Sequence, residues 1–258
     1  MIRPTSILSV MTLMVTTSVA HAAFTTPACL AKKRTAWGNL RKCQATEEAK
    51  QLLGKTPDLP KCQTKFDAKV TATTAKATAA GVPCRYADNG DGTVIDYDTG
   101  LQWEKKTPGK CSATPQLCLV DTDCPVGTCV AADPHYVNDA YSWNDALIFV
   151  NGTSDGSPVA GPFVGFAGHS DWRLPSLDEL RGVVDLNAAG CDTGSPCIDP
   201  IFGPAPGTNG GFPPFQYWSA TTQVSNPPIA RLVNFYDGSV GTFPKGMDAR
   251  VRAVRSAL

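Results

Sequence analysis

Residues 169–180 read HSDWRLPSLDEL, and the interpretation of this stretch decides the fold. The lone histidine His169 lies two positions before Asp171, so the stretch could belong to a catalytic cluster. It could equally be the start of a helix, because Ser176 followed three residues later by Glu179 matches a capping box. We favour the helix start, which makes the stretch mainly structural.

In this interpretation, Trp172 lies in the core and Leu174 packs on the first turn of the helix. Arg173 and Asp171 are expected to pair with charges on neighbouring loops, since an unpaired charge is costly to bury. Pro175 stands just before the cap. The apolar residues that follow recur at near-helical spacing and predict one buried stripe: Leu177, Leu180, Val183, Val184 and Leu186.

The first 22 residues have the pattern of a signal peptide. Arg3 supplies a positive charge, residues 7–20 are apolar, and residues 20–22 form an A-x-A cleavage site. The apolar run is too short to span a bilayer, and no other segment is apolar enough. We therefore expect an exported protein, periplasmic or extracellular, without a transmembrane segment in the mature chain.

The composition excludes some classes of partner and site. Lys and Arg together number 23, and so do Asp and Glu, so there is no global attraction to nucleic acid. Ten cysteines in an exported chain predict disulfides. There is no C-x-x-C pair, and His135 and His169 are the histidines left after cleavage, so we expect no metal site and no cofactor.

Residues 23–84 are expected to form a disulfide-linked helical hairpin. Residues 32–55 and 67–80 are rich in helix-forming side chains, and the prolines within residues 56–60 separate them. An antiparallel pair would bring together Cys29 with Cys84 and Cys43 with Cys62. The hairpin is either a spacer or docking element, or a cap packed on the main domain.

Residues 85–258 change to short alternating runs with many glycines and aromatic residues. Residues 85–103 predict a strand, a tight turn, a second strand, another turn and a third strand, and Asn89-Gly90 and Asp91-Gly92 supply the positive φ angles that hairpin turns need. Calcium binding by these acids is an alternative, although the glycines fall where ligands would be needed. Further strands are expected within residues 217–221, 230–241 and 249–255. A first helix is expected within residues 141–150, with Ser142 as its N-cap and Asp145 in its first turn.

Residues 109–135 predict a cysteine-rich insertion. We expect Cys111 to pair with Cys124 and Cys118 with Cys129, although sequence alone does not decide connectivity. Asp121 and Asp123 offer a second alternative calcium site on this insertion. A local bridge between Cys191 and Cys197 would close a turn.

Five ordered motifs then carry a family resemblance. They are DNGDGTV (88–94) with TGLQW (99–103), SW (142–143) with AL (146–147), SDWRLP (170–175) with EL (179–180), YWSAT (217–221) and VRAVR (251–255). Residues 85–256 resemble the domain family named for the C-terminal domain of the Legionella collagen-like adhesin, Lcl. The resemblance implies an α+β, C-type-lectin-like fold with a twisted antiparallel sheet, two helices and long loops. It also implies extracellular binding of a glycan or another envelope protein.

The candidate ligand site is a group of cations near the C-terminus. Arg250 and Arg252 alternate along the expected last strand, with Arg231 and Lys245 nearby, and such a group suits sulfate or carboxylate. The aromatic residues Trp103, Tyr217 and Trp218 could stack on sugars, although core packing is favoured. The expected function is a non-catalytic binding module, such as an adhesin or an envelope glycan-binding protein. The alternatives are a structural or assembly component of the envelope and a hydrolase of extracellular polymer that uses His169.

Overall fold

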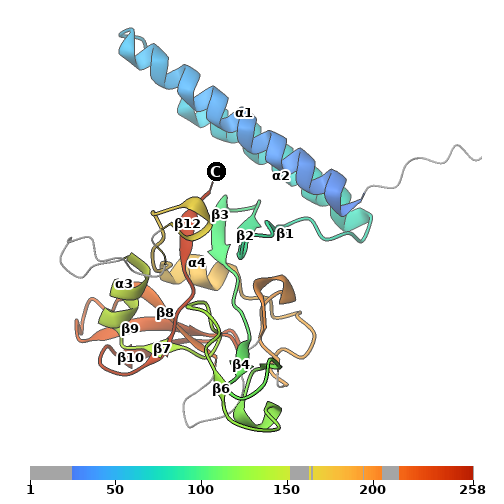
Figure 1. Ribbon diagram of the computed structural model, residues 1–258. Helices are drawn as coiled ribbons and strands as arrows, with labels where there is room; N and C mark the ends of the chain where they lie inside the picture. The colour runs from blue at the N-terminus through green and yellow to red at the C-terminus, as the bar shows by residue number, and fades with distance from the viewer. Residues whose placement is uncertain (1–24, 152–162, 164, 194, 205–214, 258) are drawn as a thin grey trace, which may run out of the picture.

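The computed structural model describes residues 25–151, 163, 165–193, 195–204 and 215–257. The expected signal peptide, residues 1–22, lies outside the described residues. Figure 1 shows two long antiparallel helices that lie across one end of a domain built from short strands and two short helices. The architecture is mixed α+β, as the sequence predicts.

The helices are α1 (Thr26–Leu52), α2 (Leu59–Ala79), α3 (Trp143–Asn151) and α4 (Leu177–Gly182). The strands are β1 (Tyr86–Asp88), β2 (Thr93–Asp96), β3 (Leu101–Glu104), β4 (Gly109–Cys111), β5 (Leu117–Cys118), β6 (Cys129–Val130), β7 (Ala140–Tyr141), β8 (Gln216–Thr222), β9 (Ile229–Asn234), β10 (Val240–Pro244), β11 (Ala249–Arg250) and β12 (Val254–Ser256). Single 3₁₀ turns occur at Asp121–Asp123, Phe166–Gly168 and Pro200–Phe202.

Both hairpin helices begin earlier than the composition predicts, because local caps set their ends. The Thr25 hydroxyl accepts a hydrogen bond from the Ala28 amide, and Asp58 caps α2 by accepting from the Lys61 amide at 3.1 Å. Pro60, expected to break the helix, lies in the first turn of α2, where proline needs no hydrogen bond. The buried Glu47 carboxylate accepts from the Asp58 amide at 2.9 Å and so ties the turn to α1.

The hairpin contributes a small core of its own and two disulfides. Cys29–Cys84 and Cys43–Cys62 link its two ends, and these are the pairs expected for an antiparallel arrangement. Between them, Trp37 packs on Phe66 with ring centroids 4.4 Å apart, and Leu40 is buried beside them. Because so little apolar surface is buried here, the disulfides must supply much of the stability.

The hairpin also contacts the domain directly. Lys33 is fully buried and forms a salt bridge with Asp98, and the Trp37 indole donates to the Tyr97 carbonyl at 2.8 Å. Arg41 donates to the Ala257 carbonyl at 2.9 Å. α1 therefore rests on the edge of the domain where the turn after β2 meets the end of the chain (Figure 1).

One sheet of the domain has the order β1-β2-β3-β12 and is antiparallel throughout. Gly90 and Gly92 have positive φ angles of 78° and 87°, which a turn of this kind requires and which glycine adopts without strain. The last strand, β12, pairs with β3, so the two ends of the domain meet in one sheet. The hairpin interpretation of residues 85–103 agrees with this structure.

A second sheet has the order β10-β9-β8-β11-β7, with β8 and β11 parallel and the other pairs antiparallel. The expected single strand over residues 249–255 is wrong. The chain leaves this sheet after Arg250 and enters the first sheet at Val254. The segment between them crosses the interior of the domain, and this crossing changes the position of Arg252.

Two apolar clusters fill the domain. One is built around Trp103, Leu180 and Phe202, and the other around Trp172, Trp218 and Leu232. The insertion lies to the side as the small sheet β5-β4-β6, with Cys111–Cys124 and Cys118–Cys129 bridged, and Cys191–Cys197 closes a separate turn. These are the pairs expected from the sequence.

The opening stretch, residues 169–180, has the geometry of a helix start. The Ser176 hydroxyl accepts from the Glu179 amide at 3.2 Å, and the Glu179 carboxylate accepts from the Ser176 amide at 2.8 Å. Arg173 forms a two-point ion pair with Glu179 at 2.6 and 2.7 Å. Trp172 is 3% exposed, which places it in the core.

The predicted buried stripe is only partly correct. Leu180 and Val183 are buried, and Leu177 and Val184 are half-buried, but Leu186 is 65% exposed. α4 ends at Gly182, after only six residues, so helical spacing no longer applies at Leu186.

Candidate functional site

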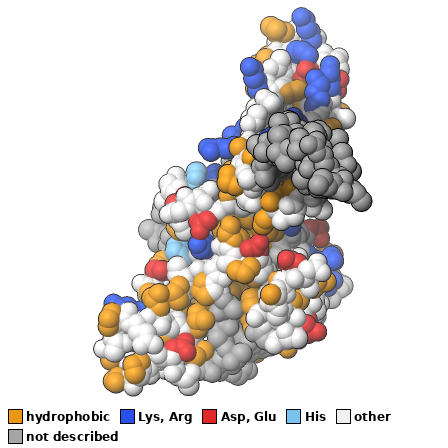
Figure 2. Space-filling view, turned by 90° about the vertical axis from the view of Figure 1, so that its right-hand side faces the viewer, with side chains coloured by type: hydrophobic (Ala, Val, Ile, Leu, Met, Phe, Trp, Pro, Cys, Tyr) orange, Lys and Arg blue, Asp and Glu red, His pale blue; other side chains and the backbone are white. Residues whose placement is uncertain are grey.

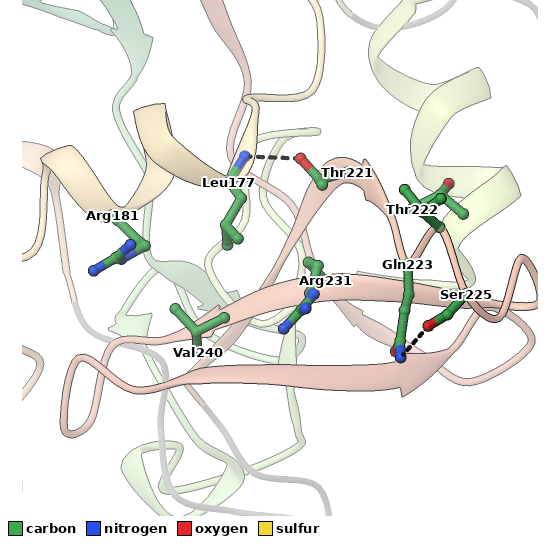
Figure 3. Close-up of a pocket in the computed structure, with 9 residues that line it drawn as sticks. Leu177, Arg181, Thr221, Thr222, Gln223, Ser225, Arg231 and Val240 are labelled. Carbon is green, nitrogen blue, oxygen red and sulfur yellow. Dashed lines mark hydrogen bonds between the residues drawn. The ribbon is translucent and has the colours of Figure 1, made fainter.

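The candidate site is an open cleft with a volume of about 750 Å³ on the domain surface. Its walls come from α4, from the end of β8 with the loop that follows, and from β9 and β10. The residues that line it are Leu177, Arg181, Thr221, Thr222, Gln223, Val224, Ser225, Arg231 and Val240. Figure 3 shows the two arginine side chains with Val240 between them in that view.

Local structure fixes the polar wall of the cleft. The Thr221 hydroxyl accepts a hydrogen bond from the Leu177 amide at 3.0 Å, so α4 is tied to the end of β8 (Figure 3). The Gln223 amide donates to the Ser225 hydroxyl at 3.2 Å. The pairing of β8 with β9 is irregular between Trp218 and Thr222, at the end of β8 that lines the cleft.

Two cations lie in this cleft, and neither is neutralised by a described acid. Arg181 is exposed on the last turn of α4, and Arg231 is half-buried on β9. No described residue forms a salt bridge with either guanidinium group. Guanidinium groups beside hydroxyl and amide groups suit a sulfate or carboxylate ligand.

Arg231 was expected at the ligand site, but Arg250 and Arg252 do not join it. Arg250 is 7% exposed; its guanidinium donates to the Val137 carbonyl at 3.1 Å, and burial lowers its pKa. Arg252 is 2% exposed and donates to the carbonyls of Glu104 and Phe202 at 2.8 and 3.0 Å. The expectation that these arginines share an open face is wrong, because the chain passes into the interior between the sheets.

Lys245 and the aromatic candidates also have internal contacts. The Lys245 ammonium lies 3.9 Å from the centre of the Trp143 ring, as in a cation–π interaction. Trp103 and Trp218 are fully buried and Tyr217 is 2% exposed, so none of the three offers a face to a sugar. The Trp218 indole donates to the Tyr141 carbonyl at 2.9 Å.

A buried ionic cluster, which sequence reasoning missed, lies on the interior side of β3. The Glu104 carboxylate accepts from the Lys106 ammonium at 2.7 Å and from the Ala253 amide at 2.9 Å, and it lies 3.0 Å from the His135 ring nitrogen. Burial opposes ionisation of Glu104, but Lys106 and His135 outweigh it and hold the pKa of Glu104 below its usual value. Glu104 and Lys106 are two residues apart on an extended segment, so their side chains lie on the same face. This spacing is the sequence feature that could have predicted the ion pair.

The other titratable candidates already have partners within the domain. Asp171 accepts from Arg255 at 2.7 Å, and this hydrogen bond lowers the pKa of Asp171; His169 beside it is half-buried. Asp91 accepts from the Thr93 amide at 3.1 Å, and Asp123 accepts from the Leu119 amide at 2.7 Å. In both candidate calcium loops, these carboxylates therefore stabilise the turn.

A sequence model of one family, the Lcl C-terminal domain, matches residues 92–255. The chain belongs to the Lcl C-terminal domain family. A comparison with curated proteins finds none that matches the chain. The match covers the domain, including the cleft, the buried Glu104 cluster and the insertion, whereas the helical hairpin lies outside it.

Within this Lcl C-terminal domain, Arg181 was the charged cleft residue that sequence reasoning missed. It lies four residues after Leu177 on α4, so it projects from the same side of the helix as that cleft residue. The helix expected from the sequence already includes Arg181. Arg181 lies in the same cleft as Arg231 only because β9 packs beside α4, and no spacing in the sequence reveals that packing.

Proposed function

We propose that this protein is an exported, non-catalytic binding module that recognises an acidic glycan of the envelope or the extracellular medium. The single observation that carries the proposal is the cleft with Arg181 and Arg231, two guanidinium groups unpaired by described acids. Membership in the Lcl C-terminal domain family supports a surface or adhesin-related role. Five disulfides support an oxidising compartment, periplasmic or extracellular.

The proposed ligand group is a sulfate or carboxylate carried on a sugar. Hydroxyl and amide groups of Thr222, Gln223 and Ser225 line the same cleft and suit sugar hydroxyls. Two antiparallel-rich sheets, two short helices and long connections support a C-type-lectin-like fold as part of the proposal. No helix in the described part of the chain is long and apolar enough to cross a membrane.

The test is a glycan array that presents sulfated, uronate-containing and neutral glycans to the mature protein. The variant R181Q/R231Q should lose the acidic glycans that the unmodified protein binds, with at least about tenfold weaker affinity for each arginine removed. The variant K42Q/K110Q removes two exposed cations elsewhere and should bind normally. Equal binding by R181Q/R231Q, or binding to neutral glycans alone, would contradict the proposal.

A second candidate function, an assembly component of the envelope, is favoured by the hairpin. α1 and α2 lie outside the family match, and the end of α1 with the start of α2 projects beyond the contacts at Lys33, Trp37 and Arg41 (Figure 1). Deletion of residues 25–84 should then change the localisation or the partners of the protein while acidic-glycan binding persists. Unchanged localisation and partners would remove this candidate.

A further inference from the structure

The charges of the chain are divided unevenly between its two parts. Residues 25–84 carry eleven Lys and Arg against four Asp and Glu, whereas residues 85–258 carry eleven against nineteen. The hairpin is therefore strongly basic and the domain is acidic, although the whole chain is neutral. The whole chain has no net attraction for anionic partners, but its N-terminal part does.

Four lysines of α2 share one face of the helix, here called the lysine face: Lys61, Lys65, Lys69 and Lys76. At about 100° per residue they fall within one quarter of the helix circumference, and they span about 22 Å along its axis. All four are exposed, and none forms a salt bridge with a described residue. Ala68 and Ala72 lie between them, so no acid interrupts the face.

The lysine face is turned away from the acidic domain. The flank of α2 that borders the domain is the one with Val70, Thr74 and Thr78, which line a hollow together with Asp98. Asp67, the one acid within α2, lies on that flank as well. The lysine face is thus a line of like charge, centred on a side of α2 away from that flank, and it is exposed to meet another surface.

Apolar side chains occupy the far end of the hairpin, here called the tip leucines. Leu52 is 89% exposed, Leu53 is 73% exposed and Leu59 is 41% exposed. Figure 2 shows apolar side chains at the top of the molecule with Lys and Arg side chains around them, and in Figure 1 that end is the turn between α1 and α2. Exposed leucines beside lysines are the combination that binds an anionic bilayer, since the leucines enter the headgroup boundary and the lysines stay in the anionic layer.

We propose that the lysine face and the tip leucines dock this protein on an anionic lipid bilayer. A dissolved polyanion would use the lysines but would gain nothing from three leucines at one end. This docking uses the hairpin, and the cleft with Arg181 and Arg231 remains open for its own ligand, so the two proposals can fail separately.

The experiment is vesicle flotation of the mature full chain with phosphatidylglycerol–phosphatidylcholine vesicles and with pure phosphatidylcholine vesicles. We expect binding to the anionic vesicles only, and weaker binding at high salt. The variant K61Q/K65Q/K69Q should bind on the order of 100-fold more weakly. The matched control R34Q/K42Q/K110Q has the same charge change at exposed sites off this face and should bind normally.

The tip leucines are tested by the variant L52S/L53S/L59S, which should bind about tenfold more weakly at equal charge. These residues are exposed, so circular dichroism should show unchanged folding in each variant. Equal binding to both kinds of vesicle, or normal binding by K61Q/K65Q/K69Q, would overturn the proposal. Binding to soluble polyphosphate without binding to anionic vesicles would also overturn it, in favour of a dissolved polyanion.

Discussion

Replacement of Glu104 by glutamine should destabilise the domain by about 3 kcal/mol or more. Glu104 is fully buried, and its carboxylate holds the Lys106 ammonium at 2.7 Å, with Lys106 itself 3% exposed. The substitution keeps the size of the side chain but removes the carboxylate charge that is hydrogen-bonded to Lys106. Removing one partner of a buried ion pair typically costs about 3–5 kcal/mol. We expect the lower end, because burial already lowers the pKa of Lys106 and the lysine can lose its proton.

The assay is urea unfolding with the disulfides oxidised, followed by tryptophan fluorescence. E104Q should lower the midpoint with little change in the slope. The double variant E104Q/K106Q should be less destabilised than the sum of the two single variants, because it leaves no unpaired charge behind. A loss below about 1 kcal/mol for E104Q, or strict additivity of the two substitutions, would refute the reasoning.

Three further predictions follow from the same structure. The stability of the folded domain should fall as the pH drops below the ordinary glutamate pKa of 4.5, because Glu104 and Glu179 have lowered pKa values in the folded state and take up protons on unfolding. A series of urea midpoints at different pH values checks this, and E104Q should reduce the dependence of the midpoint on pH. The variant C43A/C62A removes a disulfide with a sequence separation of 19 and should lower the stability of the hairpin by about 3 kcal/mol. Thermal unfolding followed by circular dichroism measures this loss, and an unchanged midpoint would contradict the role given to this disulfide. The variant G100A places a Cβ 2.5 Å from the Trp37 ring at a φ of +72°, so it should weaken the packing of the hairpin on the domain by about 1–3 kcal/mol. Trp37 should then be exposed to solvent, which a red shift of its fluorescence emission reports. The control is G54A, which is also at positive φ but in open space.

The sequence predicted those parts of the fold that depend on local chemistry. The capping box of Ser176 and Glu179, the glycine turns after β1 and the hairpin break before α2 need only neighbouring residues, and the structure contains all three. The extent of α4 was overestimated, because apolar spacing alone does not show where tertiary contacts end a helix. Leu186 is exposed for this reason.

The site was harder to predict, because it depends on contacts between distant segments. Arg250 and Arg252 look equivalent to Arg231 in the sequence, but the chain passes between two sheets there and both side chains are buried. Arg181 joins Arg231 only because α4 packs beside β9. The pairing of Glu104 with His135 joins residues 31 positions apart, so no local pattern marks it.

The most direct test of the proposed binding site is an amide chemical-shift map of the mature protein titrated with a sulfated disaccharide. We predict that the shifts concentrate on Leu177, Arg181, Arg231 and residues 221–225, and that they vanish in R181Q/R231Q. Shifts confined to the hairpin, or shifts around the cleft that persist in R181Q/R231Q, would contradict the assignment of this cleft as the acidic-glycan site.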